Sequence, residues 1–106
     1  MAQALPDAAY ADSQYSLLQL STMAEQGDAR AAYLPGTRYA SGRAGVRDDN
    51  QAVRWFKRAA ELELPEAQFN LGIMYATGRG VVRETARAAN WFRLSSEQGL
   101  ADGQHA

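Results

Sequence analysis

The chain of 106 residues repeats with a period of 36 residues. The segment YLPGTRYASG, which begins at Tyr33, aligns without a gap with the segment FNLGIMYATG, which begins at Phe69. The alignment extends to the aromatic pairs Trp55-Phe56 and Trp91-Phe92. A period of roughly 20 to 50 residues is typical of proteins whose structural repeats stack and share a continuous core. The repeat therefore predicts a solenoid of two full units with a partial unit on each side.

Each unit contains two helical patterns separated by glycine-containing loops. In the second unit, four residues have the spacing expected for one face of an α-helix: Gln68, Leu71, Gly72 and Tyr75. The first helices of the units are expected at residues 29–41 and 65–77, and the second helices at residues 49–63 and 85–98. The predicted fold class is therefore all-α, a solenoid of helical hairpins.

Residues 1–106 are expected to form a single domain with four parts. Residues 8–26 predict an N-terminal helix that caps the stack, because the later part of this segment matches the second helix of a unit. The repeats are expected at residues 29–63 and 65–99. Residues 100–106 are expected to form a partial repeat or a frayed end. Gly27 and Gly99 are expected to end second helices. An exposed end of the stack would permit self-association.

Glycines on the buried face of the first helices predict a close approach between helices. Gly36 and Gly72 align at the period and lie inside helical patterns, where glycine costs about 1 kcal/mol relative to alanine. A neighbouring helix that packs closely would explain this cost. Pro35-Gly36 is also a local turn signal. The alignment with the second unit nevertheless predicts a helix that continues through Pro35, with a kink near Ala31.

The repeated residues resemble a known family. The run EAQFNLGIMYATGRGVVRETARAANWF, followed by SEQG, resembles the Sel1-like repeat, a relative of the tetratricopeptide repeat, and the resemblance covers residues 24–103. It implies a right-handed superhelix of antiparallel helix pairs. It also implies a scaffold that binds proteins or peptides, often in bacterial systems, and it implies no reaction.

The residues offer little for catalysis. The only histidine is His105, and the chain has no cysteine, so neither a histidine-based triad nor a thiolate metal site can be assembled. The one carboxylate cluster, Glu61, Glu63 and Glu66, is better explained as a solvated set of charges near helix ends. The glycine loops link helices and lack the lysine of a phosphate-binding loop. The sequence thus predicts a protein without enzymatic activity, cofactor or metal.

The first helices are expected to line the concave wall of the stack, where a ligand would bind. The candidate partner-binding residues are Arg30, Tyr33, Thr37 and Ser41 in the first unit, and Glu66, Phe69, Ile73 and Thr77 at the same phase in the second. Aromatic and mixed polar side chains at such positions suit a peptide. For Tyr33 and Phe69, core packing is an equally good explanation. The leading prediction is a scaffold that binds a protein or peptide on this wall.

Arginines that recur in the loops give an alternative. Stacking would align Arg43, Arg47, Arg79 and Arg83 as a basic loop ridge able to bind carboxylates or phosphates. The alternative function is thus a regulatory or inhibitory subunit that binds a bacterial enzyme through this ridge. Nucleic acid is not favoured, because the net charge is -1 and no aromatic platform accompanies the ridge. Trp55 and Trp91 are interpreted as packing residues or as exposed anchors for a partner.

No membrane span or address is expected. No stretch approaches the roughly 20 apolar residues needed to cross a bilayer. The segment MAQALPDAAYADSQ has neither the basic region nor the apolar run of a signal peptide, so a cytoplasmic location is the default expectation. An exported protein without its leader would give the same pattern.

Overall fold

The computed structural model describes residues 15–42, 45 and 47–103. Within these residues the chain forms five helices and no strand: α1 (Leu17–Glu25), α2 (Ala29–Ser41), α3 (Asp49–Glu61), α4 (Pro65–Thr77) and α5 (Thr85–Gly103). The first helices of both units have the predicted bounds. The predicted all-α solenoid is confirmed.

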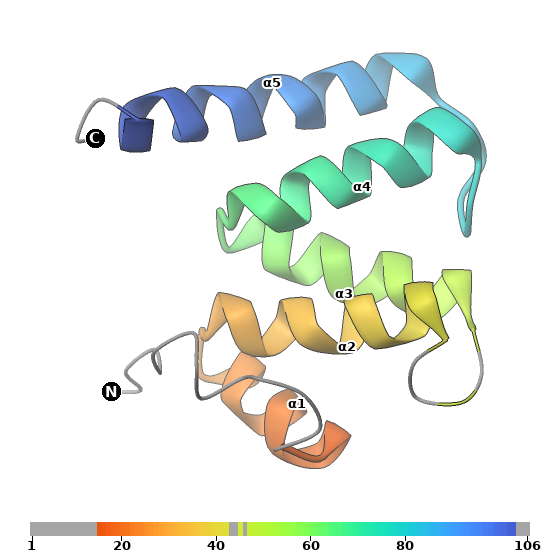
Figure 1. The fold of residues 1–106 in the computed structure, drawn as a ribbon, viewed down its shortest axis with the longest axis vertical. Coiled ribbons are helices and arrows are strands. Elements are labelled where there is room, and N and C mark those ends of the chain that lie inside the picture. The colour runs from red at the N-terminus through yellow and green to blue at the C-terminus, as the bar shows by residue number, and fades with distance from the viewer. Residues whose placement is uncertain (1–14, 43–44, 46, 104–106) are drawn as a thin grey trace.

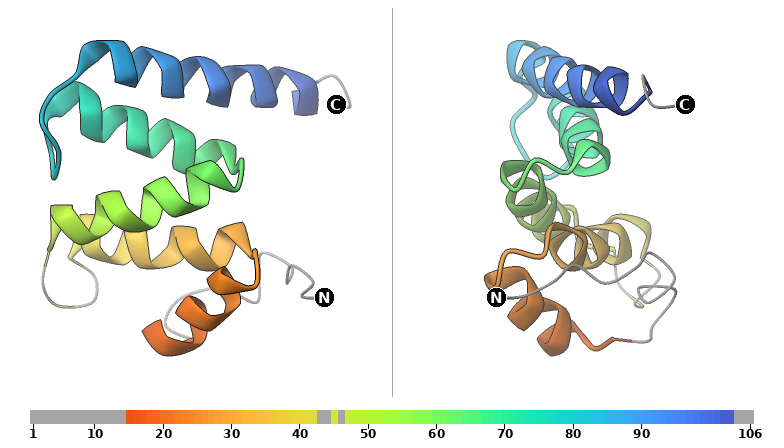
Figure 2. Two further views of the ribbon diagram at one scale, coloured as in Figure 1. Left: turned by 180° about the vertical axis from the view of Figure 1, so that it is seen from behind. Right: turned by 90° about the vertical axis from the view of Figure 1, so that its left-hand side faces the viewer.

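The helices form a stack in which neighbours along the chain are neighbours in space. Each helix packs against the next, and α2 to α5 run alternately in opposite directions (Figure 1). Seen from the side, α1 and α3 lie in one layer and α2 and α4 in the other (Figure 2). The outward sides of α2 and α4 therefore form one wall of the molecule.

Short polar side chains and glycines set the helix ends. Asp28 and Asp48 cap α2 and α3, because their carboxylates accept hydrogen bonds from the backbone N–H groups of Ala31 and Gln51 at 3.1 Å. Gly42 and Gly78 end α2 and α4 with φ angles of 75° and 72°. These left-handed conformations are readily available only to glycine, so the loop start is fixed by the sequence in both units.

The close approach predicted at the helical glycines is confirmed. A Cβ atom placed on Gly36 would lie 2.6 Å from the Phe56 ring, and one on Gly72 would lie 2.7 Å from the Phe92 ring. Each glycine thus receives the aromatic side chain of the second helix in its own unit. Phe56 is almost completely buried, at 2% exposure. The glycine and the phenylalanine recur together because they pack against each other in both repeats.

Helix α2 continues through Pro35, as the repeat alignment predicts and the local turn signal does not. Pro35 is among the most completely buried side chains of the described chain. Because proline has no N–H group, it cannot donate a hydrogen bond to the carbonyl of Ala31 four residues earlier. The bend expected near Ala31 stays a prediction.

Three helix bounds differ from the sequence-based prediction. The helix expected over residues 8–26 begins only at Leu17, since Ser16 forms a capping box with Gln19, and residues 1–14 lie outside the described residues. Helix α3 ends at Glu61 instead of residue 63, because Glu63 adopts the left-handed conformation with φ 66°. The prediction that Gly99 ends a helix is wrong, because α5 continues to Gly103.

Candidate functional site

The α2/α4 wall carries two hollows. The first has a volume of about 280 Å³ and is lined by Thr37, Ala40, Ser41, Phe56, Asn70, Ile73, Met74 and Arg79. The second has a volume of about 340 Å³ and is lined by Tyr33, Pro65, Glu66, Phe69, Asn70, Ser95 and Gly99. Asn70 lines both hollows, so they adjoin on the surface of α4.

The first hollow is lined both by apolar side chains and by the hydroxyl-bearing residues Thr37 and Ser41. Phe56 reaches it from α3, and Ile73 and Met74 reach it from α4. The hydroxyl of Thr37 donates to the Leu34 carbonyl at 2.8 Å, and that of Ser41 donates to the Thr37 carbonyl at 2.7 Å. Because the Thr37 hydroxyl proton is used within α2, the Thr37 oxygen atom remains as a hydrogen-bond acceptor for a ligand.

Two aromatic rings shape the second hollow. Phe69 is 50% exposed and packs one side of its ring against Phe92, with ring centroids 5.5 Å apart. Tyr33 packs against Phe56 at 5.7 Å, and its hydroxyl accepts a hydrogen bond of 3.0 Å from the Asn70 side chain. Both rings therefore contribute to the core and to the surface, so core packing and ligand contact are compatible at these positions.

The opposite charges of Arg30 and Glu66 on the wall neutralise each other. Arg30 of α2 forms an ion pair with Glu66 of α4, one period further along the chain. This pair joins the two repeats across the wall. It leaves the second hollow without a net charge from these two residues, so the hollow favours a neutral part of a ligand.

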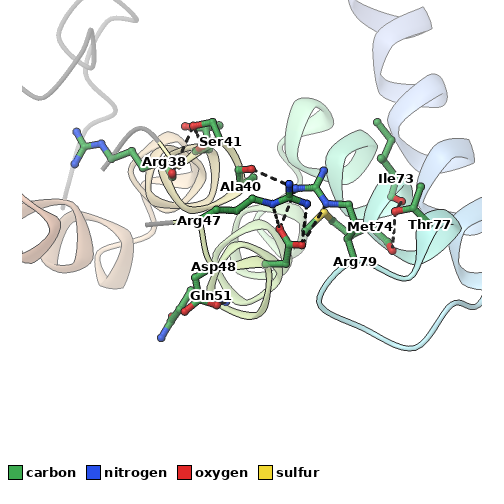
Figure 3. Close-up of polar contacts among 12 residues, drawn as sticks. Arg38, Ala40, Ser41, Arg47, Asp48, Gln51, Ile73, Met74, Thr77 and Arg79 are labelled. Carbon is green, nitrogen blue, oxygen red and sulfur yellow. Dashed lines mark hydrogen bonds and ion pairs between the residues drawn. The ribbon is translucent and has the colours of Figure 1, made fainter. Parts of the chain in front are cut away.

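At the loop edge, Asp49 pairs with two arginines of the predicted basic ridge, Arg47 and Arg79. The side chains of these two arginines extend toward one another in Figure 3. The Asp49 carboxylate binds Arg79 at 2.9 Å and Arg47 at 3.2 Å. Hydrogen bonds from Arg79, and next from Arg47, lower the pKa of Asp49 from 3.8 to about 2. Arg79 also donates to the carbonyl of Ala40 at 3.2 Å. Arg79 thus fastens the second repeat to the ends of α2 and α3.

Gly80 completes this contact between the repeats. Its φ angle is 73°, and a Cβ atom at this position would lie 2.3 Å from the carbonyl oxygen of Asp49. Only glycine allows the loop to approach the start of α3 so closely. The first unit has Ala44 at the equivalent position, which lies outside the described residues.

Comparison with known proteins identifies these repeats. The Sel1 repeat matches residues 29–64 and 65–100, which together span α2 to α5. The chain belongs to the Sel1 repeat family. Sel1 repeats are helical repeats that commonly bind proteins. Among curated proteins, no sequence matches the chain.

Solved structures support the same assignment. The Sel1 repeat protein from Oxalobacter formigenes is 37% identical with a TM-score of 0.68, and the match covers 78% of this chain and 62% of that protein. A second match is c5321, a protective antigen present in uropathogenic Escherichia coli strains that displays an SLR fold. It is 41% identical with a TM-score of 0.72, and the match covers 87% of this chain and 21% of that protein. Helicobacter pylori cysteine rich protein B is 22% identical with a TM-score of 0.75, and the match covers 84% of this chain and 70% of that protein. At this identity the match shows the fold alone.

The Sel1 repeats bring most of the predicted wall residues together. Six of the eight line the two hollows: Tyr33, Thr37, Ser41, Glu66, Phe69 and Ile73. Arg30 lies beside the second hollow through its ion pair with Glu66. Thr77 lines neither hollow, and its hydroxyl donates to the Ile73 carbonyl at 2.8 Å. Their role in binding stays a prediction.

Sequence reasoning missed Asn70, which lines both hollows. The first Sel1 repeat has Leu34 at the equivalent position, so a comparison of the repeats does not single out this residue as a shared site. A polar side chain where the other repeat has leucine is nevertheless a usable signal. It marks a position at which the second repeat departs from what packing requires.

The predicted basic ridge is only partly available to a ligand. Arg47 and Arg79 are engaged by Asp49, whereas Arg83 is exposed and forms no ion pair with the described residues. Arg43 lies outside the described residues. Trp55 and Trp91 are both partly buried against the core. The ridge as a binding site stays a prediction.

The described residues also bear on metal binding and on membrane insertion. Among the described residues, no group of three or more histidine, cysteine or acidic side chains is placed to hold a metal ion. None of the helices in the described chain combines the length and the hydropathy that crossing a bilayer requires.

Proposed function

We propose that this Sel1 repeat protein is a non-enzymatic scaffold or adaptor that binds an extended peptide segment of another protein along the α2/α4 wall. The observation that carries the proposal is the pair of adjoining hollows, joined at Asn70 and flanked by the half-exposed ring of Phe69. A large aromatic side chain that is exposed beside a hollow is typical of a binding hot spot. The family to which the chain belongs supports a protein ligand over a small molecule.

The chemistry of the wall indicates which peptide would fit. The first hollow presents Phe56, Ile73 and Met74 to an apolar side chain. The hydroxyl oxygen of Thr37 is an acceptor for a backbone N–H group of an extended chain. Since Arg30 and Glu66 neutralise each other, the peptide is expected to carry apolar residues at the hollows and few charges.

Selection from a displayed peptide library, followed by mapping of the bound peptide with NMR, tests the proposal. We expect selected peptides to share two apolar positions and to shift the backbone signals of Asn70, Ile73 and their neighbours. Phe69→Ala should weaken binding about tenfold or more, as loss of a hot-spot aromatic does. Peptides that shift only signals of other surfaces would refute the proposal.

Val82→Ala is the matched control. Val82 is 80% exposed in the loop before α5, so its truncation also removes an exposed apolar group but leaves the wall intact. Because Phe69 also contacts Phe92, thermal unfolding of Phe69→Ala must accompany the binding measurement. A folded Phe69→Ala protein with unchanged affinity would show that this ring serves packing alone.

A further inference from the structure

The outward side of α3 carries a concentration of positive charge on the opposite side of the helix from Phe56. An open hollow of about 520 Å³ lies here, lined by Gln51, Arg54, Trp55, Lys57, Arg58 and Glu61. Arg54, Lys57 and Arg58 are all exposed. The four residues Arg54, Trp55, Lys57 and Arg58 are called the α3 face below.

These three cations have no acidic partner among the described residues. The arginines of the ion pairs formed among the described residues are Arg30, Arg47, Arg79, Arg87 and Arg93. In contrast, no carboxylate of the described residues lies within ion-pair distance of Arg54, Lys57 or Arg58. Glu61, which follows Lys57 by four residues, does not pair with it, although Arg93 and Glu97 form a pair of 2.9 Å at the equivalent positions of α5.

Comparison between the repeats shows that the fold does not require this charge. The positions of Arg54, Lys57 and Arg58 are occupied in α1 by Leu18, Ser21 and Thr22, and in α5 by Asn90, Arg93 and Leu94. Helices with the same place in the stack thus form with neutral residues at two or all three of these positions. The cations of α3 are an addition that packing does not explain.

The aromatic residue of the face favours a carboxylate-bearing ligand. The guanidinium group of Arg58 lies over the Trp55 ring, 5.8 Å from its centroid. The stacked arginine is thereby held in place with its donors available. Since Arg58 covers a face of the ring, Trp55 is poorly placed to stack on a nucleic-acid base, which is the contact that sequence-independent single-strand binding uses. Arginine donors match the bidentate geometry of carboxylates and of phosphates, so the covered Trp55 ring is the feature that disfavours a nucleic acid.

We infer that the α3 face binds an acidic segment of a partner protein, by charge complementarity between Arg54, Lys57 and Arg58 and the carboxylates of that segment. This surface lies in the other layer of the stack from the α2/α4 wall (Figure 2). The inference does not depend on the proposed function, because none of the four residues lines either hollow of the wall.

Fluorescence anisotropy with a labelled synthetic peptide of alternating glutamate and serine, which offers no apolar side chain to the α2/α4 wall, tests the inference. The peptide is expected to bind, and its affinity is expected to fall as ionic strength rises, because exposed charges are screened by salt. The same peptide with glutamine in place of glutamate should not bind measurably. Equal binding of both peptides would overturn the inference.

Two variants with the same change in net charge locate the site. Arg54→Asn with Arg58→Thr introduces residues that equivalent positions of α5 and α1 already carry, so the fold should be retained. This variant should lose affinity roughly fivefold or more, the size expected when two exposed ion pairs are lost. Arg38→Gln with Arg83→Gln removes two other arginines that form no ion pair with the described residues and should retain the affinity of the unmodified protein.

Three results would overturn the assignment. An equal loss of affinity in both variants would show a response to net charge alone. A labelled single-stranded DNA oligonucleotide that binds the α3 face as tightly as the acidic peptide would show a general polyanion surface. Dimerisation that the Arg54→Asn, Arg58→Thr variant abolishes, measured by sedimentation without peptide, would assign the face to a second copy of the chain.

Discussion

Gly36→Ala is the substitution that most directly tests how the stack is built. An alanine Cβ at this position would lie 2.6 and 2.7 Å from two atoms of the Phe56 ring, closer than carbon atoms approach without displacement. Phe56 is only 2% exposed and belongs to the core, so its ring has little free space into which to move. The substitution therefore forces either Phe56 or the whole of α2 to shift.

Two opposing terms set the expected magnitude. Alanine is better than glycine inside a helix by about 1 kcal/mol. Overpacking of a well-packed core costs about 1–3 kcal/mol, and the two short contacts with a buried ring place this site in the upper part of that range. The free energy of unfolding should therefore fall by roughly 1–2 kcal/mol, which for a domain of this size lowers the melting temperature by about 4–8 °C per kcal/mol.

Urea unfolding followed by circular dichroism measures the effect, and Gly99→Ala provides the matched control. Gly99 lies inside α5, and a Cβ atom there would have no heavy atom of a neighbour within 4 Å. Gly99→Ala should thus stabilise the protein by up to about 1 kcal/mol, with only the helix-propensity term acting. If Gly36→Ala stabilised the protein to the same extent, the close approach of Phe56 to α2 would be refuted.

A double substitution separates the contact from other effects of Gly36→Ala. In a Phe56→Leu background the ring atoms that oppose the new Cβ are absent. The cost of Gly36→Ala should then be smaller than in the unmodified protein, so the two substitutions should show a coupling energy. Strictly additive effects of the two substitutions would indicate that the alanine acts elsewhere.

Two further substitutions test the contacts between and within the repeats. Asp49→Asn removes a carboxylate whose pKa is lowered to about 2 by Arg79 and Arg47. The contribution of this carboxylate to the free energy of unfolding is therefore complete above the pKa of the unfolded chain, near 3.8, and disappears as the pH falls toward 2. Since Asp49 is partly exposed, the variant's free energy of unfolding should be at most about 1 kcal/mol lower than that of the unmodified protein at neutral pH. Urea unfolding across the acid range should show this difference between the two proteins disappearing. A difference that persists at about pH 2 would contradict this account. Pro35→Leu introduces the residue that the second repeat has at Leu71 and restores an N–H donor for the Ala31 carbonyl. The free energy of unfolding should therefore rise, by up to about 3 kcal/mol when the larger side chain is accommodated. Unchanged or lower stability would show that the buried site is shaped for proline.

The period of 36 residues was sufficient to predict the fold. It placed Gly36 over Gly72 and Phe56 over Phe92, and a conformation that two aligned segments share is harder to misassign than one segment alone. For this reason α2 was predicted correctly in spite of Pro35. The local turn signal depends on two residues, whereas the helix is held by the buried face of the whole segment.

The ends of the stack were predicted less well because they have no aligned counterpart on both sides. Gly27 and Gly99 occupy the same phase, yet Gly27 has φ 94° and α5 continues through Gly99. After Gly27 the chain turns back to begin α2 under the cap of Asp28. The segment after Gly99 lacks that turn in the structure. A glycine permits a helix to end but does not require it.

The candidate sites needed distances that sequence cannot supply. The recurrence of Arg43 as Arg79, and of Arg47 as Arg83, predicted a basic ridge, but it could not show that Asp49 lies between Arg47 and Arg79. Position 13, one period before Asp49, is serine, so this ion pair has no counterpart that a comparison of repeats would reveal.

The position of α3 connects the two surfaces that are proposed to bind protein. Phe56 projects from one side of this helix to the first hollow of the α2/α4 wall and into the contact with Gly36. Arg54 and Arg58 project from the opposite side to the α3 face. Because the helix lies between them, a peptide on the wall and an acidic segment on the α3 face would not compete for space. Because Phe56 lines the first hollow of the wall and does not line the hollow of the α3 face, Gly36→Ala, which displaces that ring, should alter peptide binding on the wall and leave binding on the α3 face unchanged.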